Sequence, residues 1–201
     1  DLSETTKGAL SYSYSRIEYR EFSALRRETH MLGADLSTQW NKVTGGINYF
    51  YIRALLDGRD FLTYQRASPS VSGFVSKRWF LRAAYVHGEK TIARRPGRNA
   101  TNDGGELDAY FFWQGLRRYV NAGYNVRREQ SQADRFDYLA HQVKLRFVQR
   151  LDWFNRLATL ELAARYEVRD YSSETPSIGL EREDDRLRTK IELEVPLTQQ
   201  L

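Results

Sequence analysis

The last regular stretch of the chain, residues 184–196, alternates between charged and apolar side chains with a period of two. Its apolar positions include Leu187, Ile191 and Val195, and the positions between them are charged. A β-strand places successive side chains on opposite faces, so this period predicts a sheet with one apolar and one polar face. The β-branched residues at the apolar positions argue against a helix.

Residues 157–168 show the same alternation, with apolar side chains at even positions and polar or charged ones at most odd positions. This stretch is also rich in helix formers, and Glu161 and Arg165 have the spacing of a helical ion pair. Its surroundings favour a strand. Period-two segments recur along the whole chain and predict ten strands joined as hairpins.

The expected connections alternate in length. Tight turns are predicted near residues 41, 77, 116 and 153, and longer polar loops at 57–60, 91–106, 129–137 and 170–183. A phase slip at Ile17 predicts a bulge in the first strand, residues 8–22. Pro69 predicts a bulge or a break in pairing within residues 61–76.

Composition narrows the class of protein. The 201 residues are 41% hydrophobic and 28% charged, and no run approaches the 18 apolar residues of a membrane-spanning helix. A membrane β-barrel needs only every second strand residue to be apolar, so that class stays open. The net charge is +5, but basic and acidic residues are interleaved, so we expect no nucleic-acid partner. The absence of cysteine excludes disulfides.

Tryptophan occurs once per hairpin, always at or near a predicted short turn. The four residues, which we expect at a membrane interface as an aromatic girdle, are Trp40, Trp79, Trp113 and Trp153. Strands of about ten residues, tilted by about 45°, span roughly 23 Å, close to the apolar band of an outer membrane.

We therefore predict an all-β protein, an antiparallel up-and-down transmembrane β-barrel of about ten strands, as a single domain over residues 1–201. We expect it in a bacterial outer membrane, in contact with lipid and lipopolysaccharide. The chain is either a fragment of a larger barrel or closes by itself. The alternative is a soluble barrel or sandwich with the apolar face inward.

Charged side chains on the polar face of the last strands are expected to line the lumen. They are Lys144, Arg146, Glu161, Arg165, Glu167, Arg169, Arg186, Arg188, Lys190, Glu192 and Glu194. They form either a polar conduit or an electrostatic ladder that fills a narrow barrel. One pairing of the last hairpin places Arg165 opposite Glu192 and Glu167 opposite Lys190.

No pattern of residues indicates catalysis, a cofactor or a metal site, and we expect no enzymatic activity. The spacing of the three histidines, His30, His87 and His141, does not indicate a ligand set, and a hydrolase site near His141 lacks a G-x-S-x-G motif. Four acids are expected in loops, either solvated or binding Ca²⁺: Asp57, Asp60, Asp103 and Glu106.

Residues 115–124, 135–147 and 161–197 resemble the C-terminal β-barrel of bacterial tetratricopeptide-repeat outer-membrane proteins, the surface lipoprotein assembly modifier group. The resemblance implies a role in export, with a periplasmic repeat domain that feeds a lipoprotein or polysaccharide to the barrel. Two features depart from that group: no repeat domain precedes residue 1, and the chain does not end in an aromatic residue.

The leading functional prediction is a porin-like translocation or pore domain for a surface-directed substrate in a Gram-negative bacterium. The alternative is a structural or adhesive barrel with partner-binding external loops and a lumen plugged by side chains.

Overall fold

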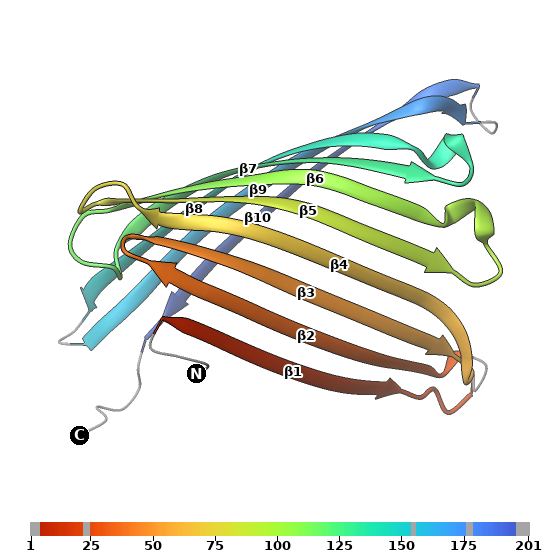
Figure 1. Cartoon of the computed structure of the whole chain (residues 1–201), viewed down its shortest axis with the longest axis horizontal. Coiled ribbons are helices and arrows are strands. Elements are labelled where there is room, and N and C mark those ends of the chain that lie inside the picture. Colours follow the sequence, from red (N-terminus) through yellow and green to blue (C-terminus); the bar gives the residue numbers. More distant parts are fainter. Residues whose placement is uncertain (1–4, 22–24, 154–155, 176–178, 196–201) are drawn as a thin grey trace.

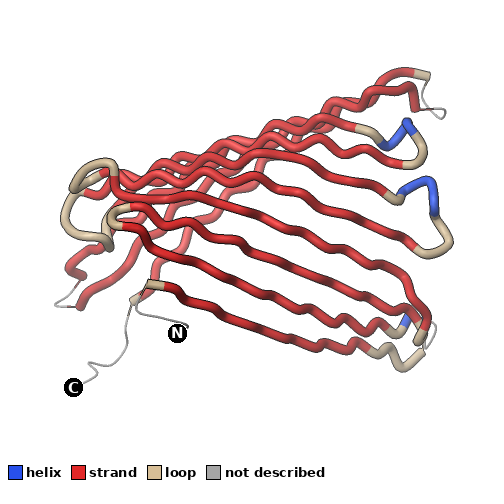
Figure 2. Tube along the Cα trace, viewed as in Figure 1, coloured by secondary structure: helices blue, strands red, loops and turns tan. Residues whose placement is uncertain are grey.

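A computed structural model of the chain describes residues 5–21, 25–153, 156–175 and 179–195. They form one antiparallel sheet of ten strands, each paired with its neighbours in sequence (Figures 1 and 2). The strands are β1 (Thr6–Ile17), β2 (Arg27–Trp40), β3 (Val43–Leu56), β4 (Arg59–Phe74), β5 (Trp79–Ile92), β6 (Ala100–Phe112), β7 (Tyr119–Ser131), β8 (Tyr138–Trp153), β9 (Arg156–Thr175) and β10 (Leu180–Glu194). The predicted all-β, up-and-down fold of ten strands is confirmed. The sheet is open, with β1 and β10 at its edges.

The sheet is strongly curled, so that β1 to β5 pass in front of β8 to β10 (Figure 1). Its polar side chains lie on the concave face, where a hollow of about 380 Å³ is lined by residues from β4 and from β6 to β10. Most large apolar side chains lie on the opposite, convex face, where many are exposed: Leu36 by 45%, Leu107 by 58% and Ile191 by 79%. The arrangement is the reverse of a soluble barrel with an apolar interior.

The tight turn predicted near residue 41 is confirmed by its backbone geometry, whereas the longer loop predicted at 57–60 is wrong, because β4 begins at Arg59 after a two-residue turn. Asn41 has a φ of 56°, and it connects β2 to β3. Asp57 and Gly58 have φ values of 51° and 72° between β3 and β4. Two consecutive positive φ values define a type I′ turn, whose twist matches that of the strands it joins.

The predicted long loops are shorter in the structure, because the strands continue into them. The connection expected at 91–106 spans only 93–99, since β6 begins at Ala100. Gly104, a turn-forming residue by composition, lies within β6, and this strand position needs a glycine because a Cβ there would collide with the carbonyl oxygen of Val126 on β7. The loop predicted at 170–183 likewise gives way to β9 and β10, which extend to Thr175 and back from Leu180.

Two predictions on strand irregularity have opposite outcomes. The bulge expected near Ile17 is wrong, because β1 pairs with β2 in one unbroken register and ends at that residue. The break expected at Pro69 is confirmed, because the ladder between β4 and β5 lacks pairs at Ser68 and Pro69 and resumes in the same register at Ser70. Proline has no N–H to donate to a neighbouring strand.

The predicted pairing of the last hairpin is also wrong. The structure places Arg165 opposite Arg188 and Glu161 opposite Glu192, rather than Arg165 opposite Glu192. The observed and predicted registers differ by four residues, an even number, so both keep the apolar faces aligned. Face patterning therefore cannot choose between them.

Cysteine pairs test this register directly, because the natural chain has no cysteine. In an Arg165→Cys/Arg188→Cys variant we expect a disulfide on mild oxidation, since these residues are direct cross-strand partners. The matched Arg165→Cys/Glu192→Cys variant separates the two sulfurs by four residues, or roughly 13 Å, and should stay reduced. Mass spectrometry after thiol alkylation measures both, and a disulfide only in the second variant would contradict the register.

Candidate functional site

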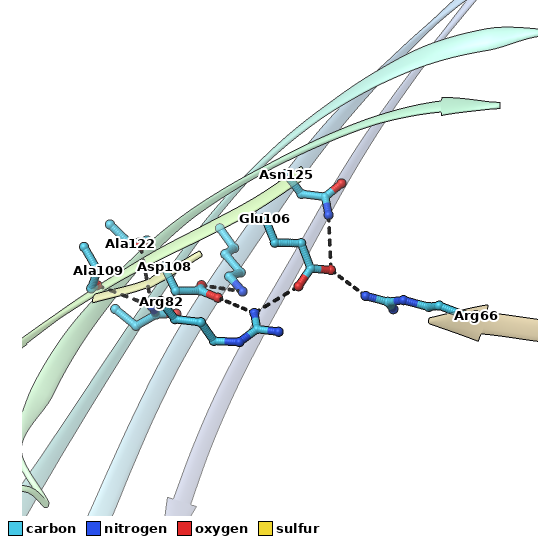
Figure 3. Close-up of polar contacts among 9 residues, drawn as sticks. Arg66, Arg82, Glu106, Asp108, Ala109, Ala122 and Asn125 are labelled. Atoms are coloured by element: carbon cyan, nitrogen blue, oxygen red, sulfur yellow. Dashed lines mark hydrogen bonds and ion pairs between the residues drawn. The ribbon is translucent and has the colours of Figure 1, made fainter. Parts of the chain in front are cut away.

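A chain of ion pairs crosses the concave face from β4 to β8 (Figure 3). Arg66 on β4 contacts Glu106 on β6 at 2.7 Å, and Arg82 on β5 contacts the other oxygen of Glu106 at 3.0 Å. Arg82 also contacts Asp108 at 3.3 Å, and Lys144 on β8 contacts Asp108 at 2.6 Å. Five charged side chains from four strands thus form one connected network.

Asp108 is the most buried member of this network, with 5% of its surface exposed. A buried carboxylate is costly unless its charge is paired and hydrogen-bonded. Arg82 and Lys144 supply the charges, and the Asn121 side-chain amide donates a further hydrogen bond at 3.4 Å. The network is therefore satisfied internally.

Several of these pairs reach over an intervening strand. Lys144 on β8 passes over β7 to Asp108 on β6, at the position of Gly123. A Cβ on Gly123 would collide with Lys144 and lie 2.6 Å from the Asp108 carboxylate. Lys90 on β5 similarly reaches Glu129 on β7 at 2.5 Å. Concave curvature brings alternate strands close enough for such bridges, and a small residue between them leaves the space.

Aromatic side chains cover the concave face at the end that holds the short turns. Ring centroids 5.1 to 6.2 Å apart connect residues of β4 to β7: Phe74, Phe80, Tyr110, Phe112 and Tyr119. Arg146 of β8 stacks over the Tyr119 ring at 5.9 Å. The charged network thus has an aromatic boundary toward this end of the sheet.

All the side chains predicted to line a lumen fall on the concave face. The registers of β8, β9 and β10 place these side chains on one face of the sheet. They are Lys144, Arg146, Glu161, Arg165, Glu167, Arg169, Arg186, Arg188, Lys190, Glu192 and Glu194. Glu161 accepts from Arg146 at 2.6 Å and from Lys190 at 3.4 Å, and Glu167 pairs with Arg169. Lys190 also pairs with Glu192 at 2.5 Å.

Sequence reasoning missed the β4–β6 half of the network. The sequence pattern assigns no role to Arg66 or Arg82 and predicts Glu106 in the loop at 91–106, because that segment is polar and rich in glycine. One signal was available: Arg66 shares its even phase with Ser68, Ser70 and Ser72. That phase makes residues 64–74 a regular strand with a polar face, and the structure confirms it.

The four acids expected in loops do not lie together at one site. Glu106 faces the concave side of β6, whereas Asp103 faces the convex side, and Asp60 pairs with Arg53 at 2.7 Å beside the β3–β4 turn. Asp57 contacts Arg26 at 3.8 Å. Among the described residues, no three or more potential metal ligands converge.

Each histidine lies near the longer-connection end of its strand on the convex face and contacts a side chain of a neighbouring strand. Tyr12 and His30 are 2.8 Å apart, and Tyr124 and His141 are 2.6 Å apart, both from Oη to Nδ1. His87 and Tyr85 share the Asp103 carboxylate. These contacts form a polar-aromatic belt, which we call the Tyr/His belt.

Tryptophans border the opposite end of the convex face. Trp40 ends β2, Trp79 begins β5, and Trp113 follows β6 and stacks on Phe147 at 5.7 Å. Trp153 ends β8, but its side chain lies outside the described part of the structure. Between the tryptophans and the Tyr/His belt the face is largely apolar. On β2, for example, Leu32, Ala34 and Leu36 share this face with His30 and Trp40.

Comparison with known protein families, with curated proteins and with solved structures finds no match for this chain. Within the described residues, no helix has the length and apolar character needed to cross a membrane.

Gly123→Val should break the Lys144–Asp108 ion pair, because the new side chain would occupy the path of the lysine. We expect the free energy of unfolding to fall by about 1–3 kcal/mol, the usual cost of removing a partner from a buried polar group. Gly105→Val on β6 is the matched control, since the nearest atom to its Cβ is 3.9 Å away. Denaturant titration measures both, and equal losses in the two variants would contradict the role of Gly123.

Proposed function

We propose that this chain is an outer-membrane β-barrel domain that forms a pore or translocation path. The carrying observation is the division of one curled ten-stranded sheet into a charged concave face and an exposed apolar convex face. Exposed apolar area on this scale needs an apolar environment, and lipid supplies it. The concave face would then line the interior.

The two convex borders support a membrane orientation. From Trp40 to His30 is ten residues on β2, and from Trp79 to His87 is eight on β5. At about 3.3 Å per residue and a tilt of about 45°, these stretches span roughly 19–23 Å, close to the ~25 Å apolar band of outer-membrane barrels. Tyrosine, histidine and tryptophan suit the interfaces at its two sides.

An export role extends this proposal through the resemblance to tetratricopeptide-repeat outer-membrane proteins. The concave path would carry a surface-directed lipoprotein or polysaccharide delivered by a periplasmic repeat domain. Both termini and the tryptophans would then face the periplasm, and lipopolysaccharide would contact the Tyr/His belt. We propose no enzymatic step.

A structural or adhesive barrel is the second candidate. The ion pairs that run from Arg66 to Lys144 favour it, because a network that is satisfied internally can fill and stiffen an interior. The concave face of β1, β2 and β4 favours a path instead. It carries short hydroxyl side chains that leave room opposite the charged strands: Ser11, Ser13, Ser37, Ser70 and Ser72.

Arginine substitutions on neighbouring residues of β2 test membrane insertion. Leu36→Arg places a charge in the middle of the convex apolar band and should lower the free energy of unfolding in lipid vesicles by about 2–4 kcal/mol. Ser37→Arg, the matched control, points to the concave face and should cost much less. Urea titration in vesicles measures both. A larger loss for Ser37→Arg would mean that the faces are assigned the wrong way round.

Planar bilayer recordings separate the two candidate functions. A path predicts discrete conductance steps from the reconstituted protein, and a plugged barrel predicts none above the bare bilayer. In Ser70→Cys, on the concave face, a bulky charged thiol reagent should reduce the conductance. Val71→Cys, on the convex face, should be unaffected. Equal responses of the two variants would exclude the concave face as the path.

A further inference from the structure

Three basic residues stand in one cross-strand row near the middle of the concave face. Lys144 on β8 is the direct partner of Arg165 on β9, and Arg165 is the direct partner of Arg188 on β10. Like charges directly opposite one another destabilise a sheet. Such a row lowers the stability of the folded sheet unless an anion binds beside it.

Among the described residues, neighbouring carboxylates neutralise only Lys144 in this row. Lys144 pairs with Asp108, whereas Arg165, Arg186 and Arg188 make no ion pair or side-chain hydrogen bond within the described part of the chain. Glu167 is the direct cross-strand partner of Arg186, yet its oxygens are taken by Arg169 and by the Gln142 amide at 2.7 Å. Three guanidinium groups therefore remain available.

These arginines line the hollow of about 380 Å³ on the concave face. Its lining includes seven basic and two acidic residues. Arg127, also in the lining, packs against the Tyr138 ring at 5.5 Å, and its Nε is buried without a hydrogen-bond acceptor. A buried donor without a partner is an independent sign that this hollow lacks an acceptor.

We propose that this hollow is a binding site for an oxyanion of at least two negative charges, held mainly by Arg165, Arg186 and Arg188. Guanidinium groups present paired N–H donors that match phosphate, sulfate and carboxylate oxygens. The site deepens the proposed function and rests on it for its place in the interior: the passing substrate would carry phosphate, sulfate or carboxylate groups.

The contrast with the rest of the concave face locates the site. Between β4 and β6, Glu106 and Asp108 match Arg66 and Arg82 in charge, so an anion gains little there. Within the lining of the hollow, β9 and β10 supply four arginines and one glutamate, so the excess of positive charge lies on that side. An anion moving along this face would therefore be held on one side of it.

Inorganic pyrophosphate is a suitable probe, titrated calorimetrically into the full chain in uncharged detergent at low ionic strength. We expect binding that weakens as salt is added. Arg165→Gln/Arg188→Gln should weaken it at least tenfold. The control, Arg146→Gln/Lys190→Gln, removes the same charge from residues that Glu161 already neutralises, and should change affinity less than threefold. Equal losses in both variants would overturn the assignment to the row.

Thermal unfolding adds a readout that a merely structural role would not produce. Without ligand at low salt, Arg188→Gln should raise the midpoint, because it relieves repulsion from Arg165. Pyrophosphate should raise the midpoint of the natural protein and have little effect on that of Arg165→Gln/Arg188→Gln. A lower midpoint for Arg188→Gln, with an unchanged response to pyrophosphate, would overturn the proposal.

Two comparisons complete the test. One distinguishes a soluble anion from a lipid headgroup, and the other distinguishes failure of the anion site from failure of the pore. Binding of pyrophosphate indicates a soluble ligand, and binding only of phosphatidic acid in mixed micelles indicates a lipid headgroup. Binding of neither overturns the site. Because the assay in detergent needs no pore, conductance without binding rejects the site alone, and binding without conductance rejects the pore alone.

Discussion

The antiparallel hydrogen-bonded ladder imposes the constraint on which the rest of this structure depends. Direct partners in such a ladder point to the same face, so the polar positions of one strand lie beside the polar positions of the next. Nine consecutive pairings maintain that phase from β1 to β10, and among the described residues register shifts occur only beside the hairpin ends at Ala54/Leu55 and Glu181/Glu183. One face therefore collects the charges and the other collects the apolar side chains.

Curvature then gives the two faces different chemistry. On the concave side, residues of alternate strands converge, so that Lys144 meets Asp108 across Gly123. The convex side spreads its apolar residues outward, which leaves them exposed along the sheet. Ion pairs in a partly buried setting contribute little net stability after desolvation. Under the proposed function, the concave charges would serve binding or passage, and the apolar band would stabilise the sheet in lipid.

Much of the fold could be predicted because its signals are local. The period of two indicated the strands and their faces, and Asn41 indicated a tight turn by residue type. The same local reasoning failed where polar composition imitates a loop. Asn102, Gly104 and Glu106 all lie in β6. The polar side chains of Asn102 and Glu106 face the concave side, and Gly104 lies close to the backbone of β7. Composition alone does not distinguish these roles.

By itself, the sequence determined that the chain folds into a two-faced antiparallel sheet, since alternation has a fixed relation to the faces of a strand. It also determined which charges of β8 to β10 share a face. Only the tertiary structure decided the register, which set Arg188 rather than Glu192 opposite Arg165. Shifts by an even number of residues preserve both faces, and convergence across alternate strands depends on curvature accumulated over the whole sheet. Neither the register nor the curvature can therefore be predicted from any single segment of the sequence.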